Sequence, residues 1–326
     1  MSERAFERSR ETSRDTSRPT SRRSALVVFP GALGDLVCLL PALRALGSRG
    51  FEDIFVACKN DLAPLVEASQ LATAIAIEDR RTAWLFQSEP PREAIEFYGA
   101  FERIDSFSGA GVPEVERNLA RFRDARVHAF RPSDRKHLAV HFFEQLSGLR
   151  PTMKDLAIDL RPSPHAIVAA RRIASGIASP WLLIHPGSGG RAKRWSRVGF
   201  ARMADRAARE LGGILVVCGD AEGGEEIEYW QSLGVRAASG MRVDVLAGLL
   251  SAADVYLGND SGVSHLAGAV GTRGVALFGP TDPGLWRPLS PRVVSIRLDP
   301  WTPCEQAAPE SALDRVWRAV APAGAP

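Results

Sequence analysis

The sequence predicts an α/β protein of two domains, each a parallel β-sheet covered by helices. Its 326 residues exceed the size at which one hydrophobic core usually stops growing, so two domains are expected. Apolar strands alternate with amphipathic helices, which is typical of parallel sheets. Both halves also begin alike, because a strand leads into a Pro-Gly turn at Pro30-Gly31 and again at Pro186-Gly187. These observations fit two Rossmann-like domains facing each other across a central cleft.

The first predicted domain covers residues 25–162. The apolar run Ala25–Phe29 predicts a strand that leads into a helix ending at Leu46, and leucines form one buried stripe along that helix. The region from 80 to 150 is expected to shape an acceptor cleft. Further elements expected in this domain are strands at 54–57 and 74–77, and helices after Asp61, at 93–101 and at 139–149.

The second predicted domain covers residues 163–326, after a composition break at Arg161-Pro-Ser-Pro164. The apolar run Trp181–Ile184 predicts a strand that enters a Gly-rich turn at His185. The other elements expected here are helices through 174 and at 197–211, 243–252, 263–270 and 310–320, and strands at 213–218 and 255–257 with one more after the helix at 263–270.

The segment from Val255 to Trp286 predicts a phosphate-binding site. A short apolar strand ends at Gly258, and Asn259–Gly262 form the turn that opens the next helix. Unpaired backbone N–H groups and the positive end of the helix dipole converge at such a turn. An anion is the ligand that this arrangement favours.

Composition narrows the class of protein. The apolar fraction of 45% and the charged fraction of 24% are ordinary for a soluble globular protein. No apolar run approaches the roughly 18 residues that span a bilayer, and the N-terminus lacks a signal-peptide core, so a cytoplasmic location is expected. The cysteines stand far apart and are expected to be reduced thiols. They are Cys38, Cys58, Cys218 and Cys304.

Residues 1–24 are predicted to be a disordered tail, because they repeat Ser, Thr and Arg with almost nothing apolar. The tail holds seven Arg against four acidic residues, so the rest of the chain is balanced at 34 basic and 34 acidic residues. Bulk charge therefore does not favour nucleic acid as a partner. A plain solvated extension is favoured for the tail, with a contact to anionic lipid or RNA as the alternative.

Three segments of the sequence resemble the signature blocks of glycosyltransferase family 9, the ADP-heptose:lipopolysaccharide heptosyltransferases. They are PGALGDLVCLLPALRAL from Pro30, HPGSGGRAKRWSRVGFARMA from His185 and GNDSGVSHLAGAVGTRGVALFGPTDP from Gly258. The resemblance implies a GT-B fold, with the acceptor bound mainly by the first domain and the nucleotide sugar mainly by the second. It also implies an inverting enzyme that needs no metal or cofactor. Such an enzyme would move heptose from ADP-heptose onto a lipopolysaccharide or other cell-envelope glycan, at the cytoplasmic membrane face.

The resemblance assigns catalysis to Asp35 and Lys193. Asp35 follows a Gly-rich turn at the carboxyl edge of the first sheet and matches the family's proposed catalytic base. A plain helix N-cap is the alternative role for that aspartate. Lys193 lies in a Gly-rich loop from which its charge would reach a diphosphate, and a solvated loop charge is the alternative.

Donor binding falls to residues of the second domain. Asp260 would accept hydrogen bonds from sugar hydroxyls, and Ser261 and Gly262 would hold the diphosphate. Ser188 and Gly189 could supply a hydroxyl and a backbone N–H to the phosphates, or serve only the geometry of their turn.

Two further donor residues are expected with alternatives beside them. His265 matches the family's motif histidine, and a satisfied structural histidine is the alternative. Glu222 stands where Rossmann-like folds place an acid on a ribose, and solvent exposure is the alternative. His137 and His141 are four residues apart and would form half a metal site, but no third ligand is evident, so no metal site is expected.

Other function classes lack their motifs. No Asp-x-Asp, Cys-x-x-Cys or His-Glu-x-x-His is present, the turn at Gly31–Gly34 lacks a full Gly-x-Gly-x-x-Gly, and neither Ser188 nor Ser261 stands in Gly-x-Ser-x-Gly. The segment Trp301–Cys304 is shorter than the Cys-rich segment of familiar members. Two alternatives therefore stay open: a transferase using another nucleotide sugar, and a non-catalytic nucleotide-sugar-binding or scaffold protein of the same fold.

Overall fold

A computed structural model describes residues 22–219 and 224–321, so residues 1–21 of the predicted tail lie outside the described part. Contacts divide the chain into two compact units. Most of the first half forms unit 1, and unit 2 begins at Thr152. Two short segments, Leu33–Cys38 and Arg135–Leu138, group by their contacts with unit 2. Each unit is an α/β structure with its own sheet and core.

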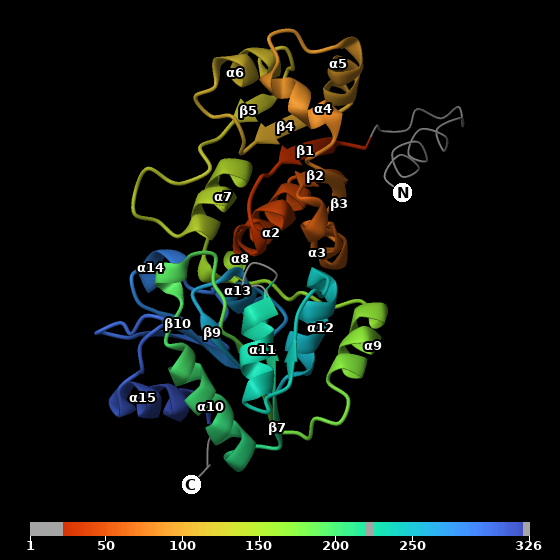
Figure 1. The fold of residues 1–326 in the computed structure, drawn as a ribbon. Helices are drawn as coiled ribbons and strands as arrows, with labels where there is room; N and C mark the ends of the chain where they lie inside the picture. The colour runs from red at the N-terminus through yellow and green to blue at the C-terminus, as the bar shows by residue number, and fades with distance from the viewer. Residues whose placement is uncertain (1–21, 220–223, 322–326) are drawn as a thin grey trace. The chain divides into compact units, whose positions relative to one another are not determined.

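Unit 1 contains a five-stranded sheet of order β3-β2-β1-β4-β5, in which all neighbours are parallel (Figure 1). The chain moves outward from β1 through β2 to β3 and then returns to place β4 on the other side of β1. The strand order therefore reverses between β1 and β4. The strands are β1 Ser24–Val28, β2 Asp53–Cys58, β3 Thr73–Ala76, β4 Arg103–Ser106 and β5 Ala125–Val127.

The first helix, α2 (Leu33–Ser48), confirms the predicted leucine stripe. Its stripe leucines are fully buried, as the 3.6-residue period requires of one helix face. They are Leu36, Leu39, Leu40, Leu43 and Leu46. The later helical elements of this half are short: η1 Asn60–Leu62, α3 Ala63–Ser69, α4 Arg80–Ala83, η2 Trp84–Phe86, α5 Arg92–Gly99, α6 Pro113–Leu119 and α7 Leu138–Ser147.

Strands β4 and β5 were not predicted, because β4 carries charged residues into the core of unit 1. The Arg103 guanidinium donates to both carboxylate oxygens of Asp105, at 2.6 and 3.0 Å. His128 Nε2 lies 2.7 Å from Asp105 Oδ1. All three side chains are buried, so their polar groups are satisfied within the fold and not by water. A hydrophobic pattern cannot reveal a strand of this kind.

Unit 2 contains a six-stranded sheet of order β11-β10-β9-β6-β7-β8, again with parallel neighbours. Its strand order reverses between β6 and β9. The strands are β6 Trp181–His185, β7 Gly213–Val217, β8 Ala237–Ala238, β9 Val255–Asn259, β10 Gly274–Phe278 and β11 Val293–Arg297.

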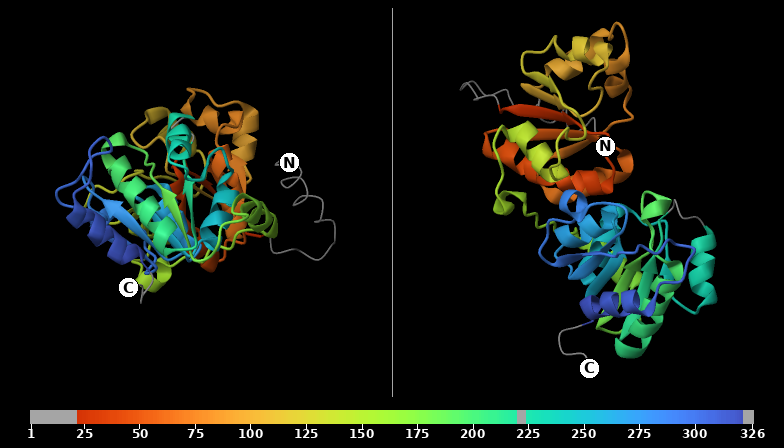
Figure 2. Two further views of the ribbon diagram at one scale, coloured as in Figure 1. Left: turned by 60° about the horizontal axis from the view of Figure 1, so that its bottom comes forward. Right: turned by 90° about the vertical axis from the view of Figure 1, so that its left-hand side faces the viewer.

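Helices cover both faces of the unit 2 sheet (Figure 1 and Figure 2). On one face, Phe200 of α10 and Trp317 of α15 belong to the core cluster formed with Leu182, Val216 and Leu257 of the strands. On the other face, α9 and α12 pack together. The helical elements are α8 Met153–Leu156, α9 Pro164–Ile173, η3 Arg191–Lys193, α10 Arg197–Glu210, α11 Gly224–Ser232, α12 Val243–Ala252, α13 Gly262–Ala269, α14 Pro283–Trp286 and α15 Glu310–Val320. Within the described ranges, no helix has the length and apolar character needed to cross a membrane.

Removing the carboxylate at the centre of the unit 1 polar cluster is expected to destabilise the protein strongly. In Asp105→Ala the buried Arg103 guanidinium loses its counter-charge, which lowers the free energy of unfolding by about 3–5 kcal/mol. The matched control is Glu96→Ala, which breaks the exposed pair with Arg92 and costs under about 0.5 kcal/mol. Urea unfolding followed by circular dichroism measures both, and equal effects of the two variants would contradict the assignment.

Candidate functional site

The candidate residues of unit 2 gather on loops at the carboxyl ends of adjacent strands. The loop after β6 carries Ser188 and Gly189, β9 is followed directly by Asp260, and β10 lies beside β9. In open α/β sheets, ligands bind outside the carboxyl ends of strands, at the point where strand order reverses. That point in unit 2 lies between β6 and β9. The strand order therefore places the motif residues at the position where open α/β sheets bind their ligands.

The side chain of Asn259 joins these loops. It is fully buried at the end of β9, its Nδ2 donates to Pro186 O at 2.7 Å, and its Oδ1 accepts from Trp195 N at 3.1 Å. Ser188 Oγ adds a second link by donating to Asp260 O at 2.7 Å. The Gly-rich loop is thus fixed at both ends against the end of β9, with η3 and Lys193 between the two ends.

Asp260 and Lys193 form an ion pair at this edge of the sheet. Lys193 Nζ lies 3.3 Å from Asp260 Oδ2, and the same oxygen accepts from Thr281 Oγ1 at 2.7 Å. The Asp260 side chain is only 8% exposed, whereas that of Lys193 is 31% exposed. The carboxylate is therefore held in place, while the ammonium keeps access to solvent and to a ligand.

The N-terminus of α13 faces the same loops. Ser261 is its N-cap residue, but no side-chain capping hydrogen bond forms. Its Oγ is buried without a hydrogen-bond partner in the described part of the chain. This hydroxyl stands at the start of an eight-residue helix, where the helix dipole and backbone N–H groups favour an anionic ligand. Lys193 is paired with Asp260, the residue directly before Ser261. Its ammonium therefore adds a positive charge near the start of α13.

Asp35 is brought to this group by a close backbone approach between two glycines. A Cβ on Gly262 would lie only 2.7 Å from Gly34 N and 2.9 Å from Leu33 Cβ, so the first turn of α2 packs closely on the start of α13. Asp35 lies in that first turn and is half-buried. A side chain on Gly262 would push the two helix starts apart, because its Cβ would lie under 3.0 Å from the backbone of Gly34.

His265 has both ring nitrogens engaged within unit 2. Its Nε2 lies 3.0 Å from Trp286 O, and its Nδ1 lies 3.6 Å from Cys38 Sγ. Because a carbonyl only accepts, Nε2 carries the proton and Nδ1 accepts from the thiol. Burial lowers the pKa of His265 to about 4, with repulsion from His137 acting in the same direction. The ring is therefore neutral at neutral pH and ties α13 to α14.

The remaining predicted residues lie apart from these contacts. Glu222 falls outside the described residues. Gly189 is exposed, and a Cβ there would meet open space. His137 donates to Arg287 O and His141 donates to Ala129 O. Each ring therefore forms a hydrogen bond with a different part of the backbone. In the described ranges, no group of three His, Cys, Asp or Glu side chains is placed to hold a metal ion.

Three residues of the site carried no predicted role: Asn259 as the link between loops, Thr281 and Trp301. The Trp301 ring packs directly on Gly279, and its Nε1 donates to Ala192 O at 3.1 Å. The loop after β10 is thereby fixed to the turn that carries Lys193. The Gly-Pro-Thr-Asp-Pro loop that follows a strand is a sequence signal that could have marked Thr281 as a functional residue. Its partner, Asp260, follows a different strand, so the sequence alone does not reveal their contact.

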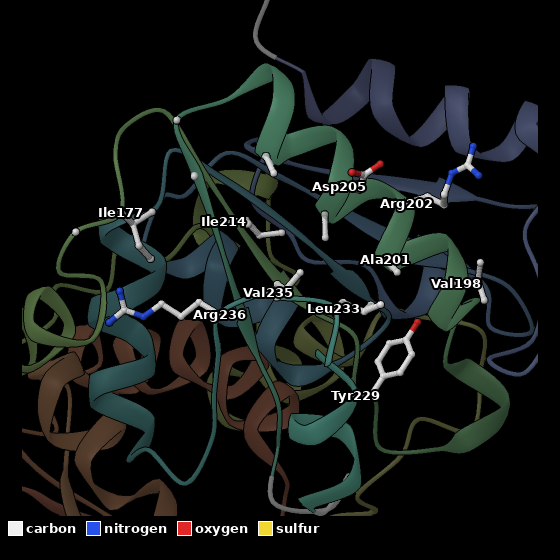
Figure 3. A pocket seen from close by; sticks show the side chains of 16 residues that line it. Ile177, Val198, Ala201, Arg202, Asp205, Ile214, Tyr229, Leu233, Val235 and Arg236 are labelled. Carbon is white, nitrogen blue, oxygen red and sulfur yellow. The ribbon is translucent and has the colours of Figure 1, made fainter. Parts of the chain in front are cut away.

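A pocket of about 720 Å³ lies elsewhere in unit 2 (Figure 3). It is lined by α10, by the start of β7 and by the end of α11 with the turn that follows. Apolar side chains such as Val198, Ala201 and Val235 dominate the view, and the predicted site residues do not line this pocket. The candidate site is thus identified by its polar groups and not by the size of a cavity.

Comparison with known proteins identifies relatives of this chain. A family model described as glycosyltransferase family 9 (heptosyltransferase) matches residues 123–312. Lipooligosaccharide heptosyltransferase 2 of Haemophilus influenzae is 32% identical over 117 residues, which cover 33% of this chain and 34% of that protein. Lipopolysaccharide heptosyltransferase 2 of Escherichia coli is 35% identical over 117 residues, 33% of each chain. The chain thus aligns with about a third of the length of these two relatives.

Solved structures share the fold. The Escherichia coli ADP-heptose lipopolysaccharide heptosyltransferase II structure has a TM-score of 0.66 at 22% identity, covering 91% of this chain and 98% of that one. A family 9 glycosyltransferase of Veillonella parvula has a TM-score of 0.70 at 17% identity, covering 85% and 86%. These likenesses confirm the predicted α/β fold of the GT-B class. Since the family match spans more than half of the residues, the chain belongs to glycosyltransferase family 9 (heptosyltransferase).

Proposed function

We propose that this chain is an inverting, metal-independent glycosyltransferase. It transfers heptose from ADP-heptose to a lipopolysaccharide or other cell-envelope glycan acceptor. The observation that carries the proposal is the Lys193–Asp260 ion pair beside the N-terminus of α13. Family membership and the names of the curated relatives, both lipopolysaccharide or lipooligosaccharide heptosyltransferases, support the choice of sugar and acceptor.

Donor recognition follows from charge and hydrogen-bonding capacity. A nucleotide diphosphate carries negative charge that Lys193 and the start of α13 attract, and the Ser261 hydroxyl at the same helix start can donate to its oxygens. Asp260 has only acceptor oxygens, so its partners on the donor are sugar hydroxyls. Gly262, Ser188 and Gly189 complete the phosphate side of the site. A contact of Glu222 with the ribose belongs to the same proposal. His265 serves the donor site indirectly, because its two ring nitrogens are engaged with Trp286 O and Cys38 Sγ and hold the start of α13 in place.

The reaction needs a base at the acceptor and charge stabilisation at the leaving group. Asp35 takes the proton of the acceptor hydroxyl, whose oxygen bonds to the anomeric carbon of the sugar as the bond from that carbon to the diphosphate oxygen breaks. Attack opposite the leaving group inverts the anomeric configuration. The negative charge that develops on ADP is stabilised by Lys193 and by the α13 dipole, so a metal ion is not required.

The acceptor determines where the protein works. A lipid-linked glycan is presented at the cytoplasmic face of the inner membrane, so the proposal places the protein in the cytoplasm with peripheral contact at that face. Its partners are then the nucleotide sugar and the glycolipid, and not a nucleic acid.

Asp35→Asn is expected to abolish turnover while donor binding survives. The amide keeps the size of the side chain but cannot take a proton, so ADP release in the presence of acceptor falls by a factor of about 100 or more. Calorimetric titration with ADP-heptose checks that binding is retained. Asp61→Asn, at an exposed position in η1, is the matched control and leaves turnover unchanged. Near-normal turnover of the Asp35 variant would exclude it as the base.

Lys193→Ala is expected to weaken ADP binding by about tenfold or more, because one charge-assisted hydrogen bond to the diphosphate is lost. Arg191→Ala is the matched control, since it removes a cation from the same turn that is exposed and paired with Glu305. Calorimetric titration of ADP in EDTA measures both variants. If Arg191→Ala weakens ADP binding as much as Lys193→Ala, the turn attracts the diphosphate only through its overall positive charge. The assignment of a specific phosphate contact to Lys193 then fails.

The same titration separates the alternatives. Tighter binding of UDP or GDP than of ADP would keep the fold and change the donor. Binding of ADP-heptose with no transfer to any envelope acceptor would favour a non-catalytic nucleotide-sugar-binding protein.

A further inference from the structure

The loop after β10 brings a hydroxyl to the buried carboxylate of the site. β9 and β10 pair in parallel with Leu277 opposite Asn259, and Asp260 N donates to Leu277 O at 2.8 Å. The residues that follow the two strands are therefore neighbours. Thr281, three residues beyond the end of β10, places its Oγ1 2.7 Å from Asp260 Oδ2.

Both ends of this loop are fixed by contacts outside it. The Trp301 ring packs on Gly279 at its start, and His265 donates to Trp286 O at its far end. Asp282 is held as well, since its Oδ1 accepts from Gly284 N at 2.9 Å and its Oδ2 accepts from Arg135 at 2.6 Å. Thr281 thus lies on a loop that is held by contacts at both ends, and its hydroxyl donates from a defined position.

Two donors meet on one oxygen of Asp260, and they differ in how firmly they are held. The Thr281 contact is the shorter one, at 2.7 Å against 3.3 Å for Lys193 Nζ. The lysine has a flexible side chain that is 31% exposed, and an ammonium has three donors to share with a ligand. A diphosphate at the start of α13 would attract the Lys193 ammonium and draw it away from Asp260. The threonine hydroxyl then remains as the partner that keeps the carboxylate plane in place.

We propose that Thr281 is a positioning residue, which orients Asp260 so that Oδ1 faces the sugar of the bound donor. In the described part of the chain, Oδ1 has no hydrogen-bond partner, whereas Oδ2 has two. A carboxylate held through one oxygen presents the other in a fixed direction, which favours hydroxyls of one stereochemistry. The inference rests on the proposed function, because it assumes that Asp260 contacts the sugar.

The test compares the affinities for ADP-heptose and for ADP, with and without the hydroxyl. Thr281→Val keeps the branched shape but cannot donate, and Thr281→Ser keeps the hydroxyl. Thr281→Val is expected to lower ADP-heptose affinity about tenfold while ADP affinity stays within about twofold of the unchanged protein. Thr281→Ser is expected to restore the ratio of the two affinities. The full chain is used throughout, with calorimetric titration in EDTA.

Several outcomes would overturn the inference. One such outcome is that Thr281→Val leaves both affinities unchanged. Another is that it weakens the binding of both ligands equally, as a general disturbance of the loop would. Either result removes the link between the hydroxyl and the sugar. Should the valine variant fail to fold by circular dichroism, Thr281→Ala removes the same hydroxyl without the second methyl group and replaces it. If the unchanged protein binds neither ligand, the proposed function itself fails, which is distinguishable from failure of the Thr281 assignment alone.

Discussion

The buried amide of Asn259 is the interaction on which the arrangement of the site depends. It bonds to Pro186 at the start of the Gly-rich loop and to Trp195 just after the turn that carries Lys193. Because Asn259 is the last residue of β9, the same backbone that holds the loop continues into Asp260 and Ser261. One side chain with no exposed surface therefore sets the distance between the cation and the anion of the site. A buried amide is stable only when its N–H and C=O groups form hydrogen bonds. In Asn259 both Nδ2 and Oδ1 do so.

Around that link, elementary helix and sheet physics accounts for the rest of the site. Parallel strands place their following loops at one edge, reversal of the strand order opens a crevice there, and the α13 dipole favours an anion beside it. The close approach of Gly34 and Gly262 brings the first turn of α2, which carries Asp35, to the start of α13. His265 is neutral and turned inward, so it ties helices together, while the charged residues face the crevice. Within a few residues of one another, some polar side chains of the site hold the fold together and others are placed to contact the ligand.

Local patterns predicted most of the fold and part of the site. The helices at 243–252 and 310–320 have the expected bounds, because an apolar stripe with a clear start and end is a local signal. The Asp260–Gly262 turn was likewise visible, since strand, turn and helix follow one another in sequence. Strand β4 was missed because Arg103 and Asp105 satisfy each other inside the core. The contact of Thr281 with Asp260 depends on the pairing of β9 with β10, which no local pattern contains.

The most direct measurement is transfer itself. Purified full-length protein is incubated in EDTA with ADP-heptose and a heptose-deficient lipopolysaccharide acceptor. ADP release is followed by chromatography, and the acceptor mass is followed by mass spectrometry. The account predicts that ADP appears in equal amount to heptose added to the acceptor. Intact ADP-heptose binding without any gain of mass on the acceptor would contradict it.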